Sequence, residues 1–150
     1  MGETVVYDNP KVFIRQSAKE LIANIDFGSS AANNSLYVFS LRNNSAHSLF
    51  ILKFLCAWLN SDLMTFYAQQ QNIIRFAQGK QPQIKVSDLG TIPFPTNFHF
   101  QETIVNIAEK IFDKQDSIEI HKTEINNLVY QYYELSEEQI VHIQKSIKDF

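Results

Sequence analysis

A strand followed by a capped helix is encoded between residues 36 and 59, in the sequence LYVFSLRNNSAHSLFILKFLCAWL. The first six residues are almost wholly apolar and end before a pair of asparagines, which predicts a buried strand over Leu36–Leu41. The next residues, Asn43–Ser45, offer an N-cap. Apolar side chains then recur at helical spacing over Ala46–Leu59. The stretch therefore predicts a strand that leads into an apolar helix.

Two shorter strands are expected upstream of this unit, over Lys11–Gln16 and Glu20–Asp26. The three residues Ser17–Lys19 between them have the length of a hairpin connection. The following segment, Phe27–Ser35, is rich in Gly, Ser, Ala and Asn, and we interpret it as a loop.

The sequence after the apolar helix becomes polar. Ser61 is placed to cap a second helix that runs to about Gln70. The segment Gln69–Gln83 is rich in Gln and contains a Gly and a Pro, so we expect a loop there. A short strand over Gln83–Val86 follows it.

Pro93 and Pro95 end the globular part of the chain, and helical patterns follow them. Apolar residues alternate in steps of four and three over 101–133, which predicts one long helix with a heptad seam. Ser136–Gln139 has the pattern of a capping box that starts a last helix. The seam comprises Ile104, Ala108, Ile111, Gln115, Ile118, Lys122, Ile125, Val129 and Tyr132.

The expected fold class is α+β. It consists of a small mixed or antiparallel sheet with packed helices, followed by a long C-terminal helix and a short helix. We expect an α/β body over 1–100 and a helical spacer or docking arm over 101–150.

The composition excludes several classes of protein. With 150 residues, 45% of them hydrophobic, the chain is long and apolar enough to fold around a core. Its single cysteine, Cys56, excludes an internal disulfide. No uninterrupted apolar run of about 18 residues indicates a membrane span, and no start segment has the pattern of a signal peptide. We therefore expect a cytoplasmic protein.

Catalytic and metal-binding motifs are nearly absent from the sequence. There is no Gly-rich phosphate loop and no nucleophile-elbow pattern, and no histidine has a second His or Cys at ligand spacing. Asp62 and Asp88 stand near the starts of predicted elements and are most simply caps or turn formers. We expect a chain that is not an enzyme by itself and that holds no metal.

The net charge of −3 conceals an uneven distribution. Residues 1–100 contain 8 Lys and Arg against 6 Asp and Glu, whereas residues 101–150 contain 5 against 10. The acidic excess belongs to the C-terminal part, so a basic patch on the N-terminal part remains compatible with a nucleic-acid partner.

The stretch Gln69–Val86 is the strongest candidate for contact with nucleic acid. It contains Arg75, Lys80 and Lys85 and no acidic residue. Basic side chains bind phosphate or guanine, and Gln side chains read adenine edges. The simpler interpretation is a polar surface loop with ordinary amide content.

The segment Phe13–Lys19 has the same character, since it contains Arg15, Gln16 and Lys19 and no acidic residue. Strand alternation separates the faces of Arg15 and Gln16. Arg15 therefore has a second interpretation, as a partly buried residue that pairs with an acid such as Asp26.

Six groups of residues carry a family resemblance in a fixed order. They are Phe13–Ser17, Asn34–Val38, Leu59–Ser61 with Phe66–Tyr67, Gly79–Lys80 with Pro82–Ile84, Leu89–Pro95, and Leu128–Tyr130 with Tyr133–Glu138. The chain resembles the C-terminal specificity domain of TaqI-like adenine-specific DNA methyltransferases and restriction-modification enzymes. It is more distantly similar to the target-recognition domains of type I specificity subunits. The resemblance extends from about Lys11 to about Gln144.

The resemblance implies a division of labour. A methyltransferase core binds S-adenosylmethionine and flips the target adenine, while the specificity domain reads base edges. The Asn-Pro-Pro-Tyr-type tetrapeptide of the core is absent, and Asn9–Lys11 resembles it only superficially. The implied chain is a non-catalytic reader without a cofactor. Its implied partners are double-stranded DNA and a methyltransferase or restriction core in the same or another chain.

On this interpretation, two sets of side chains contact DNA. We expect Lys19, Arg75, Lys80 and Lys85 to contact phosphates. We expect Gln16, Gln81, Gln83 and Arg15 to read bases. Gly79, Pro82, Asn60 and Ser61 match the family pattern and are expected to be structural.

The main alternative is a protein-interaction module that binds no DNA. In that case residues 101–150 form a helical hairpin or a coiled coil that assembles a complex. Clustering of the four basic residues on one concave face would favour DNA binding, and scattering would favour the module. A stand-alone nuclease or methyltransferase would need a carboxylate cluster or a cofactor loop, and the sequence has neither.

Overall fold

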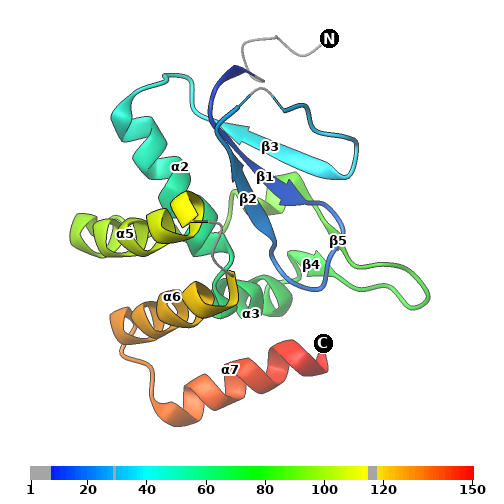
Figure 1. Cartoon of the computed structure of the whole chain (residues 1–150). Helices are drawn as coiled ribbons and strands as arrows, with labels where there is room; N and C mark the ends of the chain where they lie inside the picture. The colour runs from blue at the N-terminus through cyan, green and yellow to red at the C-terminus, as the bar shows by residue number, and fades with distance from the viewer. Residues whose placement is uncertain (1–7, 29, 115–117) are drawn as a thin grey trace.

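A three-stranded antiparallel sheet with β1 at its centre forms one layer of the structure (Figure 1). The computed structural model describes residues 8–28, 30–114 and 118–150. β1 spans Lys11–Arg15 and pairs with β2, Ala23–Asp26, on one side and with β3, Leu36–Ser40, on the other. The expected α+β class with an antiparallel sheet is confirmed.

β1 is central because its alternating side chains meet a helix on one face. Val12 and Ile14 are almost completely buried, as are Ala23 and Ile25 on β2. The helix α2, Ala46–Leu59, packs on β1 and β2 and covers this face. The period of two along the strands therefore places the core between the sheet and α2.

One end of the sheet is closed by an ion pair inside the fold. Lys11 is 0% exposed, and its Nζ lies 2.8 Å from Asp26 Oδ2 and donates to Gly28 O at 2.7 Å. The pairing of Arg15 with Asp26 is wrong. In the register Lys11 faces Asp26, so exposed Arg15 lies at the opposite end of the strand.

The pKa of Asp26 lies below its ordinary value, mainly because Lys11 hydrogen-bonds to the carboxylate. Hydrogen bonds from Gly28 N and from Ser30 act in the same direction, whereas partial burial opposes them. A pKa lowered on folding stabilises the protein above the pKa of the unfolded chain, and this stabilisation is lost as the pH falls through the folded-state value.

We expect Asp26→Asn to lower the free energy of unfolding at neutral pH by about 1.5–3 kcal/mol, the usual contribution of a hydrogen bond to a charged group. The same change should flatten the loss of stability in acid, because the variant has no carboxylate to protonate at this position. Urea denaturation at neutral pH and at a pH near 3, for the variant and the unaltered chain, measures both effects. Equal acid sensitivity of the two proteins would contradict the assignment.

Two helices follow β3, as the sequence predicts. α2 begins after Ser45, whose side chain accepts from Ser48 N, and α3, Asp62–Gln70, begins after Ser61, whose side chain accepts from Met64 N. Both predicted N-caps are confirmed.

Asn60 ties the junction of the two helices to the sheet. Its Oδ1 accepts from Ala23 N at 3.1 Å, and its Nδ2 donates to the carbonyl oxygens of Ala23 and Cys56, both at 2.8 Å. One side-chain amide therefore satisfies backbone groups of β2 and α2 at the same time. This finding supports the structural role expected for Asn60.

We expect Asn60→Ala to lower the free energy of unfolding by about 1–3 kcal/mol, because the Ala23 amide group loses its partner in a part-buried position. Thermal or urea denaturation measures the change. Substitution of the exposed Asn34 by Ala serves as the matched control and should change stability by less than about 0.5 kcal/mol. Similar stability of the two variants would contradict this role.

The Gln-rich segment contains more structure than the predicted loop. β4, Ile74–Arg75, pairs antiparallel with β5, Gln83–Ile84, and α4, Val86–Leu89, follows directly. The strand predicted over Gln83–Val86 is therefore shorter. Ile74 and Ile84 face each other and are 1% and 2% exposed, so two apolar side chains anchor an otherwise polar hairpin.

The single long helix predicted over 101–133 is wrong. The structure has α5 over Phe98–Lys114 and α6 over Ile118–Tyr132, which pack against each other. The seam residue Gln115 and the side chains of Ile111 and Ile118 lie outside the described part of the chain.

The fold-back of α5 and α6 has a simple packing reason. The seam residues Ile104, Ala108, Ile125 and Val129 are all buried in the same core as α2. A straight helix over 101–133 would place about half of them beyond the body, since a helix rises 1.5 Å per residue. Packing of α5 on both α2 and α6 buries them instead.

The last helix, α7, spans Glu137–Asp149 and packs on α3. The predicted capping box is confirmed, because Ser136 accepts from Gln139 N and the Gln139 side chain accepts from Ser136 N. The C-terminal helices therefore lie on the body, and their division from it as a separate arm stays a prediction.

Among the described residues, no single helix is long and apolar enough to cross a membrane. α2 and α3 taken together meet that test by length and composition, but they bend by 69° at their junction. Both helices contribute buried side chains to the core.

Candidate nucleic-acid interface

Three segments that are distant in the sequence meet at the end of the sheet opposite the Lys11 ion pair. Gln16 N donates to Ser35 O at 3.0 Å, which joins the end of β1 to the start of β3. Ile84 N donates to Gln16 O at 2.8 Å, and this bond attaches the β4–β5 hairpin to the same point. Tyr37 supports the junction, since its hydroxyl donates to Ile84 O at 2.8 Å. Figure 1 shows the β1–β2 turn beside β4 and β5.

The β1–β2 turn is also held by side chains. Ser17 Oγ donates to Pro82 O at 2.8 Å and lies 3.4 Å from the Gln81 side-chain oxygen. On the other side of the turn, Gln69 Nε2 donates to Lys19 O at 2.9 Å from the end of α3. The turn and the hairpin therefore form one hydrogen-bonded unit.

The predicted base-reading residues lie on these segments. Arg15, Gln81 and Gln83 are exposed. Gln16 is half-buried, and its Nε2 donates to Leu36 O at 3.2 Å. The Gln16 side-chain amide group therefore uses one of its hydrogen bonds to bind the start of β3.

The predicted phosphate-contacting residues surround the hairpin. Lys19, Lys80 and Lys85 are exposed in the β1–β2 turn, in the hairpin loop and directly after β5. Arg75 differs from them, because its guanidinium lies 2.8 Å from Asp88 Oδ2 and its Nε donates to Asn72 O. The sequence predicts only a cap or a turn former at Asp88, whereas the structure shows that its carboxylate offsets the charge of Arg75.

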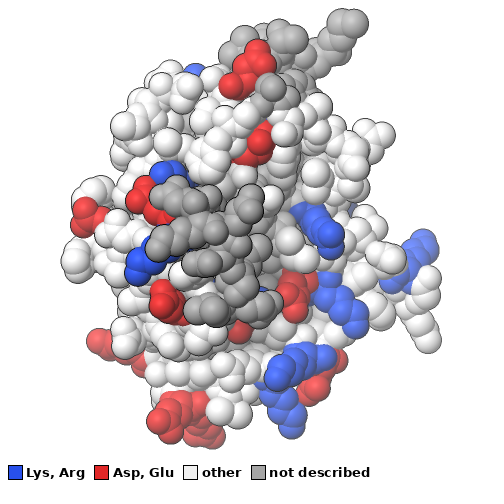
Figure 2. All heavy atoms as spheres, viewed as in Figure 1, with Lys and Arg blue, Asp and Glu red and all other residues white. Residues whose placement is uncertain are grey.

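The surface charge follows this arrangement. Figure 2 shows Lys and Arg side chains gathered on the side of the molecule that carries the hairpin and the end of α7. Asp and Glu are more frequent on the opposite side and at the lower edge of this view. Clustering of the four predicted basic residues on one concave face stays a prediction.

The hairpin loop requires glycine at one position. Gly79 has φ of +77°, a conformation that side chains with a Cβ rarely adopt, and Lys80 N donates to Ala77 O in the same turn. A Cβ added at Gly79 would meet no heavy atom within 4 Å, so the requirement comes from the backbone alone. The structural role expected for Gly79 follows from this conformation.

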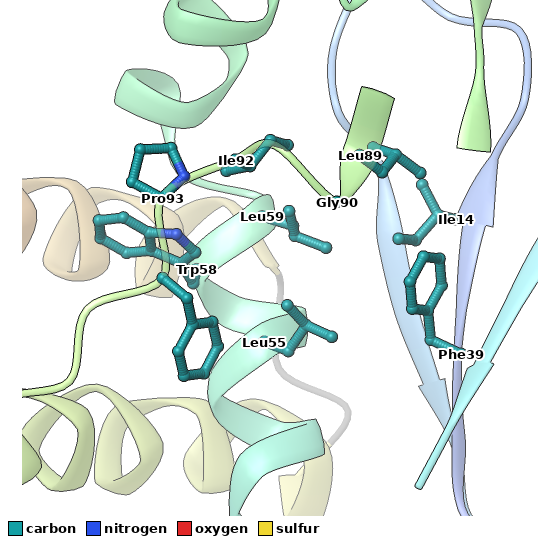
Figure 3. Close-up of a pocket in the computed structure, with 10 residues that line it drawn as sticks. Ile14, Phe39, Leu55, Trp58, Leu59, Leu89, Gly90, Ile92 and Pro93 are labelled. Atoms are coloured by element: carbon teal, nitrogen blue, oxygen red, sulfur yellow. The ribbon is translucent and has the colours of Figure 1, made fainter. Parts of the chain in front are cut away.

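A cavity lies away from the hairpin, between α2, the sheet and the segment after α4 (Figure 3). It has a volume of about 150 Å³ and carries no titratable side chain. It therefore offers no group for acid–base chemistry. The lining residues are Ile14, Phe39, Leu55, Trp58, Leu59, Leu89, Gly90, Ile92, Pro93 and Phe94.

Residues suited to metal binding or nucleophilic catalysis do not gather in the part of the chain that the structure describes. No group of three or more His, Cys, Asp or Glu that would hold a metal ion is present among those residues. Burial raises the pKa of the Cys56 thiol to about 12, so the reactive thiolate is scarce at neutral pH.

Sequence reasoning missed the residues that hold the site together. Ser17 and Tyr37 donate across the junction, and Phe76, next to Arg75, is a large exposed aromatic residue. Ser17 lies in the predicted turn, but only the tertiary structure brings it to Pro82.

The comparisons with known proteins agree with this architecture. A family model described as the TaqI-like C-terminal specificity domain matches residues 2–94. The chain belongs to this family of specificity domains. The match includes the sheet, α2, α3 and the hairpin, and it ends before α5. Among curated proteins no match to the chain is found.

We expect Tyr37→Phe to loosen the hairpin, because the Ile84 carbonyl loses the hydroxyl that donates to it while the ring stays in place. The free energy of unfolding should fall by about 0.5–1.5 kcal/mol, the net contribution of one hydrogen bond. Hydrogen exchange of the Ile84 amide should accelerate more than that of the buried strand β1. Tyr67→Phe, in which a half-buried tyrosine of α3 is changed, is the control. Unchanged exchange at Ile84 would contradict the role of Tyr37.

Proposed function

We propose that this chain reads double-stranded DNA for a restriction-modification methyltransferase and performs no chemistry itself. The observation that carries the proposal is the junction at Gln16, where the β1–β2 turn and the β4–β5 hairpin are joined within a member of a specificity-domain family. Base-edge readers and basic residues are needed together for sequence recognition, and the two segments supply both.

The side chains have different roles in this proposal. Lys19, Lys80 and Lys85 are exposed and form no ion pair with any residue that the structure describes, so they contact phosphates and set the register on the duplex. Arg75 contributes less net charge, because Asp88 lies beside it. Gln81 and Gln83 are exposed and offer both a donor and an acceptor to adenine.

Arg15 and Gln16 stand at the edge of the same reading surface. Arg15 is exposed at the end of β1, where it reaches guanine or phosphate. Gln16 reads a base through its carbonyl oxygen, since its amide nitrogen is occupied by Leu36 O.

Methylation belongs to a separate core in this proposal. That core, in the same chain or in another one, binds S-adenosylmethionine and flips the adenine. The specificity domain holds the duplex from the other side, and the complex works in the cytoplasm. The acidic C-terminal part suits contact with protein better than contact with DNA.

A second candidate function is a helical protein-interaction module. The observation in its favour is that α5 and α6 pack as a hairpin and carry exposed aromatic side chains, Phe98 and Tyr132. Large exposed aromatic residues are typical of protein interfaces. This function uses the surface of α5 and α6, whereas DNA reading uses the β1–β2 turn and the hairpin. A measurement of DNA binding therefore distinguishes the two functions.

We expect the chain to bind random duplex DNA, with an affinity that falls steeply as salt rises from about 50 to about 200 mM, because counterion release drives the contact with phosphates. Lys80→Ala with Lys85→Ala should weaken binding and reduce the slope of log affinity against log salt by about 1–2. Fluorescence anisotropy with a labelled duplex measures both quantities.

The matched control removes two positive charges elsewhere. Arg42 lies beyond the other end of β3, and Lys110 lies on α5, and both are exposed. Arg42→Ala with Lys110→Ala should leave the slope nearly unchanged. No binding at the lower salt would favour the interaction module, and equal losses in the two double variants would contradict the placement of the site.

A further inference from the structure

The two long edges of the β4–β5 hairpin are held very differently. The β5 edge receives three hydrogen bonds, to or from Gln16, Ser17 and Tyr37. On the β4 side, Arg75 pairs with Asp88, but the Arg75 side chain is 47% exposed. The start of β4 is held on the body, because Ile73 and Ile74 are buried and Ile73 N donates to Ala68 O at 2.8 Å. Exposed ion pairs contribute little to stability, so the chain beyond Arg75 needs another support.

An aromatic contact from the end of the chain supplies that support. Phe76 directly follows β4 and is 57% exposed. The ring of Phe150 lies edge to face with it, with ring centroids 6.4 Å apart and an interplanar angle of 73°. This geometry is one that aromatic pairs prefer.

Phe150 is itself anchored in the fold. It is half-buried and packs against the core at the end of α7. α7 packs on α3, where Ile143 is buried and the rings of Phe66 and His142 meet edge to face. The C-terminal end of α7 lies beneath α3 and β4 in Figure 1. The contact therefore connects the hairpin to a helix that is packed on the body rather than to another loop.

We propose that Phe150 is a positioning residue that holds the β4–β5 hairpin in the orientation needed to bind DNA. This inference rests on the proposed function of the hairpin. Without the contact to Phe150, the residues that follow β4 would be held only from the β5 side and would sample several orientations. The apparent dissociation constant rises in proportion as the competent fraction falls. The helix α7, which lies outside the family match, thus supports the β4–β5 hairpin through the contact between Phe150 and Phe76.

The test is Phe150→Ala in the full chain, with two measurements. Amide hydrogen exchange of residues 76–81 should accelerate, whereas exchange in β1 and α2 should stay the same. The dissociation constant for random duplex should rise by about two- to tenfold, the scale of one aromatic pair. The salt slope should not change, because no phosphate contact is removed.

Two further variants make the result specific. Phe150→Leu keeps an apolar side chain on the core and removes the ring, so it should give the same effects in smaller degree and guards against a folding defect. Val141→Ala changes the most exposed apolar residue of the same helix, 62% exposed, and should change neither measurement.

Each outcome decides a separate point. Unchanged amide exchange of residues 76–81 in Phe150→Ala would overturn the positioning role, whether or not the chain binds DNA. Faster exchange with an unchanged dissociation constant would overturn the link between orientation and binding. Failure of the unaltered chain to bind duplex at about 50 mM salt would instead overturn the proposed function.

Discussion

The hydrogen bond from Ile84 N to Gln16 O is the constraint on which the arrangement of the interface depends. Together with the bond from the Tyr37 hydroxyl to Ile84 O, it joins two separate sheets, since β1–β3 and β4–β5 share no strand pairing. A two-strand ladder of two residues each is too small to be stable by itself. The hairpin keeps its shape because this bond and the buried pair Ile74–Ile84 attach it to the body.

The two ends of β1 carry basic residues that differ in burial, and the strand register accounts for the difference. β1 begins at Lys11, whose buried ammonium group pairs with the Asp26 carboxylate and donates a hydrogen bond to Gly28 O. β1 ends at Arg15, which remains exposed beside polar turns. A strand of five residues thus carries one buried cation and one exposed cation, and the pairing register decides which of the two meets Asp26.

The local elements follow from the sequence where the signal is local. The strand over Leu36–Ser40, the helix over Ala46–Leu59 and the caps at Ser45, Ser61 and Ser136 depend on alternation, helical spacing or a residue three positions away. Each of these signals lies within a few residues, so a single sequence contains it.

The remainder depends on tertiary contacts. The partner of Asp26 is decided by strand register, and the break between α5 and α6 is decided by the space available beside α2. Of the site, the sequence supplies the basic and amide residues around the hairpin. It does not supply the contacts of Ser17, Tyr37 and Asp88, because their partners lie between 13 and 65 residues away along the chain.

The hairpin loop has a consequence for how this protein can diversify. The hairpin is attached through Arg75 and Phe76 on one side, through residues 81–84 on the other, and through the buried side chains of Ile74 and Ile84. The loop between them carries no core residue, and closing a somewhat longer loop costs little, since the entropy grows only with the logarithm of length. Apart from Gly79, whose backbone conformation requires glycine, the loop can therefore be exchanged, lengthened or shortened while the core stays intact.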